Sequence, residues 1–284
     1  MTIAVTGASG QLGRLAVEAL LRREAGPIVA IVRDPAKVTD LAARGVEVRR
    51  ADYDDVASLD AALVGVRRLL LVSGSEPGKR IPQHTNVIRA AERAGVELLA
   101  YTSIPRATQT PMLLAAEHRG TEEVLAGSSV PYVLLRNGWY WENYLRGLAP
   151  ALQAGVLYGA SGDGRVAGAA RADYAEAAAV VLSTDGHAGA VYELGGDERL
   201  TLTELAGVIS AVSGTAVRYQ DVSAADYAEA LEKAGIPGGF AQILADSETG
   251  ASNGWLDVTS GDLHTLNGRP STPVADVFRA ALAG

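Results

Sequence analysis

The chain of 284 residues contains no cysteine. This absence excludes disulfide bonds, thiolate nucleophiles and cysteine-ligated zinc. It also fits a reducing compartment, so we expect a cytoplasmic protein. Histidine is scarce as well, with four residues in the chain, and no two of them have the spacing of metal ligands. We therefore expect no metal site.

Long apolar runs are also missing. No run reaches the roughly 18 residues that a membrane-spanning helix needs. The charge-free run from Gly147 to Gly162 contains proline, glutamine and several glycines, and it indicates a helix end followed by a loop. The first basic residue is Arg14, so the basic start of a secretory signal is missing. We expect neither a signal peptide nor a membrane partner.

Basic residues are fewer than acidic ones, 25 against 33, which gives a net charge of −8. This balance argues against a nucleic-acid partner, because proteins that bind nucleic acids usually present an excess of lysine and arginine. The length is sufficient for one large or two modest domains with a buried core. The apolar fraction of 48% is ordinary for a globular protein.

The first half of the chain alternates between short apolar segments and helical patterns. Several of the apolar segments are continuous, such as Leu69–Val72, as expected for a parallel sheet that is covered on both faces. Strands that alternate with helices predict βαβ units and therefore a doubly wound α/β sheet. The predicted strands are 3–6, 28–33, 46–50, 68–73, 97–103 and 132–136, and the predicted helices are 12–24, 37–43, 58–63, 82–94 and 113–126.

Helical patterns dominate the second half, at 173–183, 203–213, 224–234 and 273–283. One apolar segment there, 190–195, predicts a strand that rejoins the sheet. Thr201 with Glu204, and Ser223 with Asp226, have the spacing of helix caps. We therefore predict a doubly wound domain over residues 1–150 and a smaller, mostly helical lobe for the substrate over residues 151–284.

A glycine-rich turn, Thr6–Gly13, joins the first predicted strand to the first predicted helix. Gly7 permits a tight turn, Gly10 lets the backbone approach a phosphate, and Gly13 lets the helix pack closely on the strand. The start of the helix offers free N–H groups and the positive end of its dipole. We interpret the turn as the pyrophosphate site of a Rossmann sheet, and the alternative is a tight turn without a ligand. The predicted cofactor contacts are Thr6, Gly7, Ser9, Gly10, Gln11, Leu12 and Gly13.

Three further strand ends carry residues that suit a dinucleotide. Arg33 ends the second strand, where arginine favours the 2′-phosphate of NADP(H), and a surface pair with the adjacent Asp34 is the alternative. Asp52 follows the third strand and either accepts the adenine amino group or closes a turn. The segment Ser73, Gly74 and Ser75 ends the fourth strand, where a glycine lets the backbone pass close to a cofactor or forms a plain turn.

The reaction class follows from the scarcity of lysine. Short-chain dehydrogenases that act on alcohols use a tyrosine, with a lysine four residues later, as proton donor. The lysines of this chain are Lys37, Lys79 and Lys233, and none follows a tyrosine at that spacing. Reduction of an ordinary carbonyl group is therefore disfavoured. A quinone fits better, because it accepts hydride readily and becomes an aromatic hydroquinone anion.

The segment Arg136–Tyr144 follows the sixth strand and is rich in aromatic and amide side chains, in a chain with 5% aromatic residues. We expect it at the ligand-binding edge of the sheet, beside the nicotinamide. Its flat rings and its amide groups suit a flat ligand with carbonyl groups, and a hydrophobic plug is the alternative. Asn137, Tyr140 and Asn143 are the predicted catalytic residues, and Arg171 is a further predicted cofactor contact.

Together these motifs resemble the NmrA-like atypical short-chain dehydrogenases, and more narrowly the bacterial type 2 NAD(P)H:quinone oxidoreductases. The similarity runs nearly end to end, and its most specific part is the Asn–Gly–Trp–Tyr sequence at 137–140. The segments that carry it are Thr6–Gly13, Ala30–Arg33, Arg50–Tyr53, Ala100–Ser103, Leu135–Tyr140, Arg171–Tyr174, 245–247 and 250–252.

The resemblance implies NADP(H) as cofactor, a small quinone as substrate, and direct hydride transfer without flavin or metal. It implies that the glycine turn and Arg33 hold the pyrophosphate and the 2′-phosphate, and that Asn143 faces the substrate. A homodimer is compatible with the sequence. The alternative function is a non-catalytic NADP(H)-binding redox sensor of the NmrA type, which the missing Tyr–Lys pair also fits. The implied lining of the cofactor consists of Ser73, Gly74, Ser75, Asn137, Gly138, Trp139 and Tyr140.

Overall fold

The computed structural model describes residues 1–283. These residues form two compact units that interleave along the chain. The first unit comprises Met1–Ile104, Glu117–Asn137 and Arg171–Tyr192. The second comprises Pro105–Ala116, Gly138–Ala170 and the described residues from Glu193 onward. The boundary predicted at residue 150 is thus corrected, because the chain leaves the first unit three times and returns to it twice.

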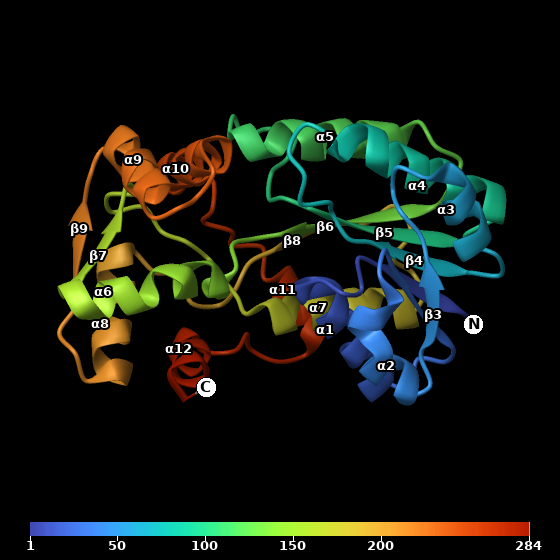
Figure 1. The fold of residues 1–284 in the computed structure, drawn as a ribbon, viewed down its shortest axis with the longest axis horizontal. Helices are drawn as coiled ribbons and strands as arrows, with labels where there is room; N and C mark the ends of the chain where they lie inside the picture. Colours follow the sequence, from blue (N-terminus) through green and yellow to red (C-terminus); the bar gives the residue numbers. More distant parts are fainter. Residues whose placement is uncertain (284) are drawn as a thin grey trace. The chain divides into compact units, whose positions relative to one another are not determined.

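A seven-stranded sheet organises the first unit, in the order β3-β2-β1-β4-β5-β6-β8 (Figure 1). Each neighbouring pair from β3 to β6 is parallel. The direction in which strands are added reverses between β1 and β4, so the predicted doubly wound topology is confirmed. The strands are β1 (Ile3–Thr6), β2 (Ile28–Val32), β3 (Glu47–Arg50), β4 (Arg68–Leu71), β5 (Leu98–Ser103), β6 (Tyr132–Asn137) and β8 (Val191–Leu194).

Helices cover both faces of this sheet (Figure 1). On one face lie α1 (Gln11–Arg22) and α7 (Arg171–Ser183), which pack against each other. On the other face lie α3 (Val56–Ala62), α4 (Arg80–Ala94) and α5 (Leu113–Ala126). Because both faces are covered, every residue of β1, β2 and β5 is buried, which explains their continuous apolar sequences. Between β2 and β3 the chain forms η1 (Pro35–Val38) and α2 (Thr39–Ala43).

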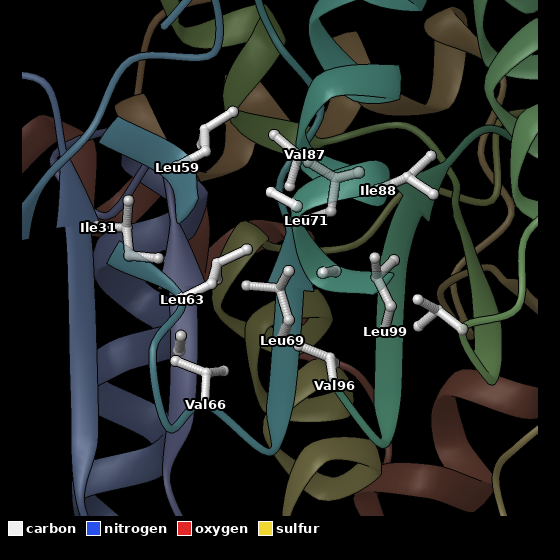
Figure 2. Close-up of a cluster of buried hydrophobic side chains, with 14 of the residues drawn as sticks. Ile31, Leu59, Leu63, Val66, Leu69, Leu71, Val87, Ile88, Val96 and Leu99 are labelled. Atoms are coloured by element: carbon white, nitrogen blue, oxygen red, sulfur yellow. The ribbon is translucent and has the colours of Figure 1, made fainter. Parts of the chain in front are cut away.

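Figure 2 shows the hydrophobic core between the sheet and helices α3 and α4. Leu69 and Leu71 of β4 and Leu99 of β5 have no solvent exposure, and neither do Val87 and Ile88 of α4. Burying each such side chain stabilises the fold by about 1.5–3 kcal/mol. This core fixes the strands whose carboxyl ends carry the polar residues described below.

The second unit is mostly helical and contains a parallel pair of short strands, β7 and β9. Thr201 and Glu204 form a reciprocal capping box at the start of α8, and the Ser223 hydroxyl accepts from Asp226 N at the start of α9, as predicted. The run 147–162 is not a helix end and loop, because it contains a complete helix and a strand. The elements are η2 (Trp141–Gly147), α6 (Leu148–Ala154), β7 (Val156–Gly159), α8 (Leu202–Ser213), β9 (Arg218–Asp221), α9 (Ala224–Lys233), α10 (Gly238–Ser252), α11 (Asp262–Asn267) and α12 (Val274–Ala283).

Candidate active site

A cavity of about 290 Å³ lies in the first unit, where the strand order reverses. Its lining comes from the segments that follow β1, β2, β3 and β4, all of which leave the same edge of the sheet. This is the position at which doubly wound sheets bind ligands. The lining residues are Gly7, Ser9, Gly10, Gln11, Leu12, Gly13, Ile31, Val32, Arg33, Ala51, Asp52, Tyr53, Val72, Ser73, Gly74, Ser75, Glu76 and Gln83.

The glycine turn has the backbone that the sequence predicts. Gly7 has a φ of +58°, a conformation that residues with a side chain rarely adopt. A Cβ at Gly13 would lie 2.3 Å from the carbonyl oxygen of Gly7, so α1 can approach the turn this closely only with glycine. These two positions leave the turn narrow and free of side chains where a diphosphate would lie.

The start of α1 faces this turn without a side-chain cap. Gly10 is the N-cap residue and makes no side-chain hydrogen bond, and Arg14 N donates to Gly10 O at 3.0 Å. The amides of Gln11, Leu12 and Gly13 precede that bond, so they belong to the donors that a helix cannot satisfy internally. Backbone donors and the positive end of the helix dipole together suit an anion such as a pyrophosphate.

Arg33 follows β2 and lines the cavity with 70% of its side chain exposed. Its nearest anionic partner is Glu76, at 3.4 Å between Nη1 and Oε1. Asp34 has a different role, since its carboxylate accepts a hydrogen bond from Ala36 N at 3.0 Å and caps η1. The alternative of an Arg33–Asp34 surface pair is therefore wrong, and the guanidinium stays beside the cavity.

Asp52 and Tyr53, which follow β3, also line the cavity. Asp52 Oδ1 accepts from Asp54 N at 3.0 Å, so the residue closes a turn as well as facing the cavity. The Tyr53 hydroxyl lies 2.5 Å from that of Thr6, and burial raises the pKa of Tyr53. Thr6 itself is fully buried, and its Oγ1 also accepts a hydrogen bond from Val72 N at 3.0 Å. Thr6 thus binds two lining residues, Tyr53 and Val72, but does not itself line the cavity.

The segment after β4 is held by side chains from neighbouring elements. Ser73 N donates to Thr102 Oγ1 at 2.8 Å, and Gly74 N donates to His84 Nε2 at 3.0 Å. Arg80 Nε donates to Gly74 O at 2.6 Å, so both polar groups of Gly74 are engaged. The predicted segment 73–75 thus lines the cavity as a fixed wall, which a plain exposed turn would not provide.

His84 is neutral in this arrangement. Because Nε2 accepts from Gly74 N, the proton lies on Nδ1, which is 2.9 Å from Thr121 Oγ1. Burial, assisted by the charge of Arg80, lowers the pKa of His84 to about 3. The imidazole therefore remains an acceptor for Gly74 across the physiological pH range.

The ends of β5 and β6 carry buried polar groups that pair with one another. Ser103 Oγ donates to Glu122 Oε1 at 2.5 Å, and Arg136 Nη2 lies 2.6 Å from Glu122 Oε2. Tyr101 and His118 meet at 2.8 Å between Oη and Nδ1, and burial lowers the pKa of His118. A neutral histidine carries no positive charge, so it cannot lower the pKa of a tyrosine as the lysine of a Tyr–Lys pair does.

The predicted catalytic segment lies after β6. Asn137 ends β6 in the first unit and is 6% exposed. In the second unit, Asn143 N donates to Tyr140 O at 3.0 Å, which holds these two residues on one turn. Trp141 between them is buried, and its ring lies where a Cβ of Gly168 would approach within 2.8 Å, so this tryptophan belongs to the core.

Several of the predicted contacts are outside the set that lines the cavity. Asn137 and the first residue of α7, Arg171, belong to the first unit. The second unit contains Gly138, Trp139 and Tyr140. Their role toward a cofactor or substrate stays a prediction.

Seven lining residues were not predicted, namely Ile31, Val32, Ala51, Tyr53, Val72, Glu76 and Gln83, and the last two carry polar side chains outside the predicted strand ends. Gln83 lies in the first turn of α4 and donates to Asp54 Oδ2 at 3.0 Å. Glu76 lies in the irregular segment between β4 and α4, where no periodicity marks which side chains face inward. Its position could have indicated it, because Glu76 comes two residues after Gly74, at the strand end that was already assigned to the cofactor.

Within residues 1–283, no helix combines the length and the apolar character needed to cross a membrane. Over the same residues, no cluster of three or more histidine, aspartate or glutamate side chains is arranged to hold a metal ion.

Comparison with known proteins places the chain among dinucleotide-binding enzymes. The model of a family described as NAD(P)H-binding matches residues 7–185. Quinone oxidoreductase 2 of Escherichia coli (strain K12) is 54% identical over 275 residues, which cover 96% of each chain. The crystal structure of an NADPH-dependent quinone oxidoreductase from E. coli with NADPH superposes with a TM-score of 0.95, at 53% identity, over 99% of this chain and 100% of that one. The Citrobacter sp. triphenylmethane reductase complexed with NADP(H) gives a TM-score of 0.93 at 39% identity, over 98% and 99% of the two chains.

Proposed function

The chain belongs to the NAD(P)H-binding family, and from this membership we propose that it is an NADPH-dependent quinone oxidoreductase. The observation that carries the proposal is the cavity of the first unit, which joins an uncapped helix start to an arginine at the end of β2. The similarity to a quinone oxidoreductase over nearly the whole chain supports the substrate class.

The residues of the cavity fit a dinucleotide with a 2′-phosphate. The amides of Gln11–Gly13 would hold the pyrophosphate, and Gly7 and Gly13 keep side chains away from it. Arg33 would bind the 2′-phosphate, since a guanidinium matches a phosphate in geometry and charge. Asp52, at the end of β3, would accept a hydrogen bond from the adenine amino group.

When bound, NADPH supplies a hydride that reduces a quinone by two electrons and leaves a hydroquinone anion, which takes a proton from water. The protein then needs neither a flavin nor a metal, and it needs no strong acid at the carbonyl oxygen. The fixed wall at 73–75, held by Thr102, His84 and Arg80, would keep the bound cofactor in one position.

Asn137, Tyr140 and Asn143 complete the proposal as the residues that face the reacting groups. Amide and phenol donors can bind quinone oxygens as negative charge develops on them. Gly138 and Trp139 would line the cofactor beside them, and Arg171 would be a further cofactor contact. We also propose a homodimer and a cytoplasmic location, which light scattering and cell fractionation would test.

The experiment that tests the proposal is NADPH oxidation at 340 nm by the purified protein, with and without 1,4-benzoquinone. Saturable oxidation that depends on the quinone, and that is faster with NADPH than with NADH, supports the enzyme. Tight NADP(H) binding without turnover with any small quinone contradicts it. That second result would favour the non-catalytic redox sensor instead.

A further inference from the structure

Acidic residues outnumber basic ones among the residues that line the cavity. Among the described lining residues, the charged side chains are Arg33, Asp52 and Glu76, so two carboxylates accompany one guanidinium. Asp52 uses one oxygen to close its own turn with Asp54 N. Glu76 is the carboxylate that pairs with Arg33, at 3.4 Å.

Glu76 binds a second cation as well. Its Oε2 lies 3.0 Å from Lys79 Nζ, while its Oε1 faces Arg33. One carboxylate therefore pairs with two cations, Arg33 and Lys79. Its side chain is 40% exposed and that of Arg33 is 70% exposed, so both partners are accessible to a ligand and to solvent.

The two dinucleotides would meet this pair differently. A 2′-phosphate beside Arg33 needs the guanidinium for itself and is repelled by the Glu76 carboxylate. A ribose with a free 2′-hydroxyl carries no such charge, and this hydroxyl can donate a hydrogen bond to an acidic residue. The same carboxylate thus opposes NADPH and tolerates or assists NADH.

We propose that Glu76 is a specificity-determining residue: it competes with the 2′-phosphate for Arg33 and lowers the preference of the protein for NADPH over NADH. The inference rests on the proposed function, because it assumes that a dinucleotide occupies the cavity with its adenosine ribose beside Arg33. An exposed ion pair is weak, so the competition is modest and falls as salt screens it.

The test is the binding of each dinucleotide to wild type and to Glu76→Gln, measured by titration calorimetry at low ionic strength. We expect the Kd for NADPH to fall roughly two- to fivefold in the variant, while the Kd for NADH stays the same or rises. The gain should shrink at high ionic strength, because the interaction it removes is electrostatic.

A matched control removes the same charge elsewhere in the first unit. Glu47 pairs with Arg49 at 2.8 Å on β3 and is outside the set of lining residues. Glu47→Gln should leave both dissociation constants unchanged.

The outcomes separate the two levels of the proposal. If wild type binds neither dinucleotide, the proposed function fails. If it binds both, and Glu76→Gln leaves the ratio of the Kd for NADH to the Kd for NADPH unchanged or lowers it, the role of Glu76 is overturned while the proposed function stands. A change of equal size in Glu47→Gln also overturns it, because the effect would then be one of net charge.

Discussion

Replacing Gly13 by alanine tests whether the glycine turn is built for close packing around a diphosphate. The added Cβ would lie 2.3 Å from Gly7 O and 2.8 Å from Gly7 C, and both atoms belong to the backbone. A contact of this length cannot be relieved by rotating a side chain, so α1 must move away from the turn. Overpacking of this kind costs about 1–3 kcal/mol of stability.

The same movement displaces the amides of Gln11 and Leu12 from the turn. Hydrogen bonds to a charged phosphate contribute about 1.5–3 kcal/mol each, so losing the alignment of one of them weakens NADPH binding roughly ten- to hundredfold. The assay is urea unfolding of the variant, together with a calorimetric titration with NADPH under conditions where the variant is folded.

Gly207→Ala is the matched control. Gly207 lies within α8, is exposed, and has no atom within 4 Å of its Cβ position. Alanine should therefore stabilise the helix by about 0.5–1 kcal/mol and leave NADPH binding unchanged. If Gly13→Ala is as stable as wild type and binds NADPH equally well, the close-packing account of the turn is refuted.

Three further predictions concern single residues. Arg33→Ala should raise KM for NADPH about ten- to hundredfold and leave KM for NADH nearly unchanged, and equal effects in steady-state assays would remove its assignment to the 2′-phosphate. Asn143→Ala should lower kcat with quinone about tenfold while the Kd for NADPH stays near normal, and unchanged turnover would leave it a packing residue. Burial raises the pKa of Glu248 to about 7, so the stability it contributes is complete below its ordinary pKa of 4.5 and is lost as the pH rises through 7. Glu248→Gln should gain up to about 3 kcal/mol over wild type between pH 4.5 and pH 8 in urea unfolding, and an equal difference at both pH values would contradict this sign.

The first unit could be predicted from the sequence because its strands are buried on both faces. Strands such as β1, β2 and β5 are continuous apolar runs, and helical patterns separate them, so the order of elements can be predicted. Two units were predicted, but their boundaries could not be read from the sequence. Hydrophobic periodicity reports which face of an element is buried, but not that α7 returns to the first unit.

The second unit was harder to predict for local reasons. Strand β9 has four residues, Arg218–Asp221, and the polar sequence RYQD gives no alternating pattern. Helix α10 begins with two glycines after Pro237, which are poor helix formers. Both elements depend on tertiary contacts, β9 on its pairing with β7 and α10 on its packing against α9.

Some features of the cofactor cavity could likewise be predicted from the sequence, and others could not. Gly7 and Gly13 were predictable because covalent geometry leaves no other residue for a positive φ or for a 2.3 Å Cβ approach. The pairing of Arg33 with Glu76 was not, since the two residues come from different strand ends and meet only in the folded sheet. Sequence adjacency pointed to Asp34, which instead caps η1.

The most direct test of the account is the deuterium isotope effect on quinone-dependent oxidation of NADPH labelled at nicotinamide C4. The protein would first be shown by its absorbance spectrum to be free of flavin. The account predicts saturable turnover without added flavin, a preference for NADPH over NADH, and slower oxidation of the deuterated cofactor. No quinone-dependent turnover, or turnover that appears only when flavin is added, would contradict direct hydride transfer from a dinucleotide in this cavity.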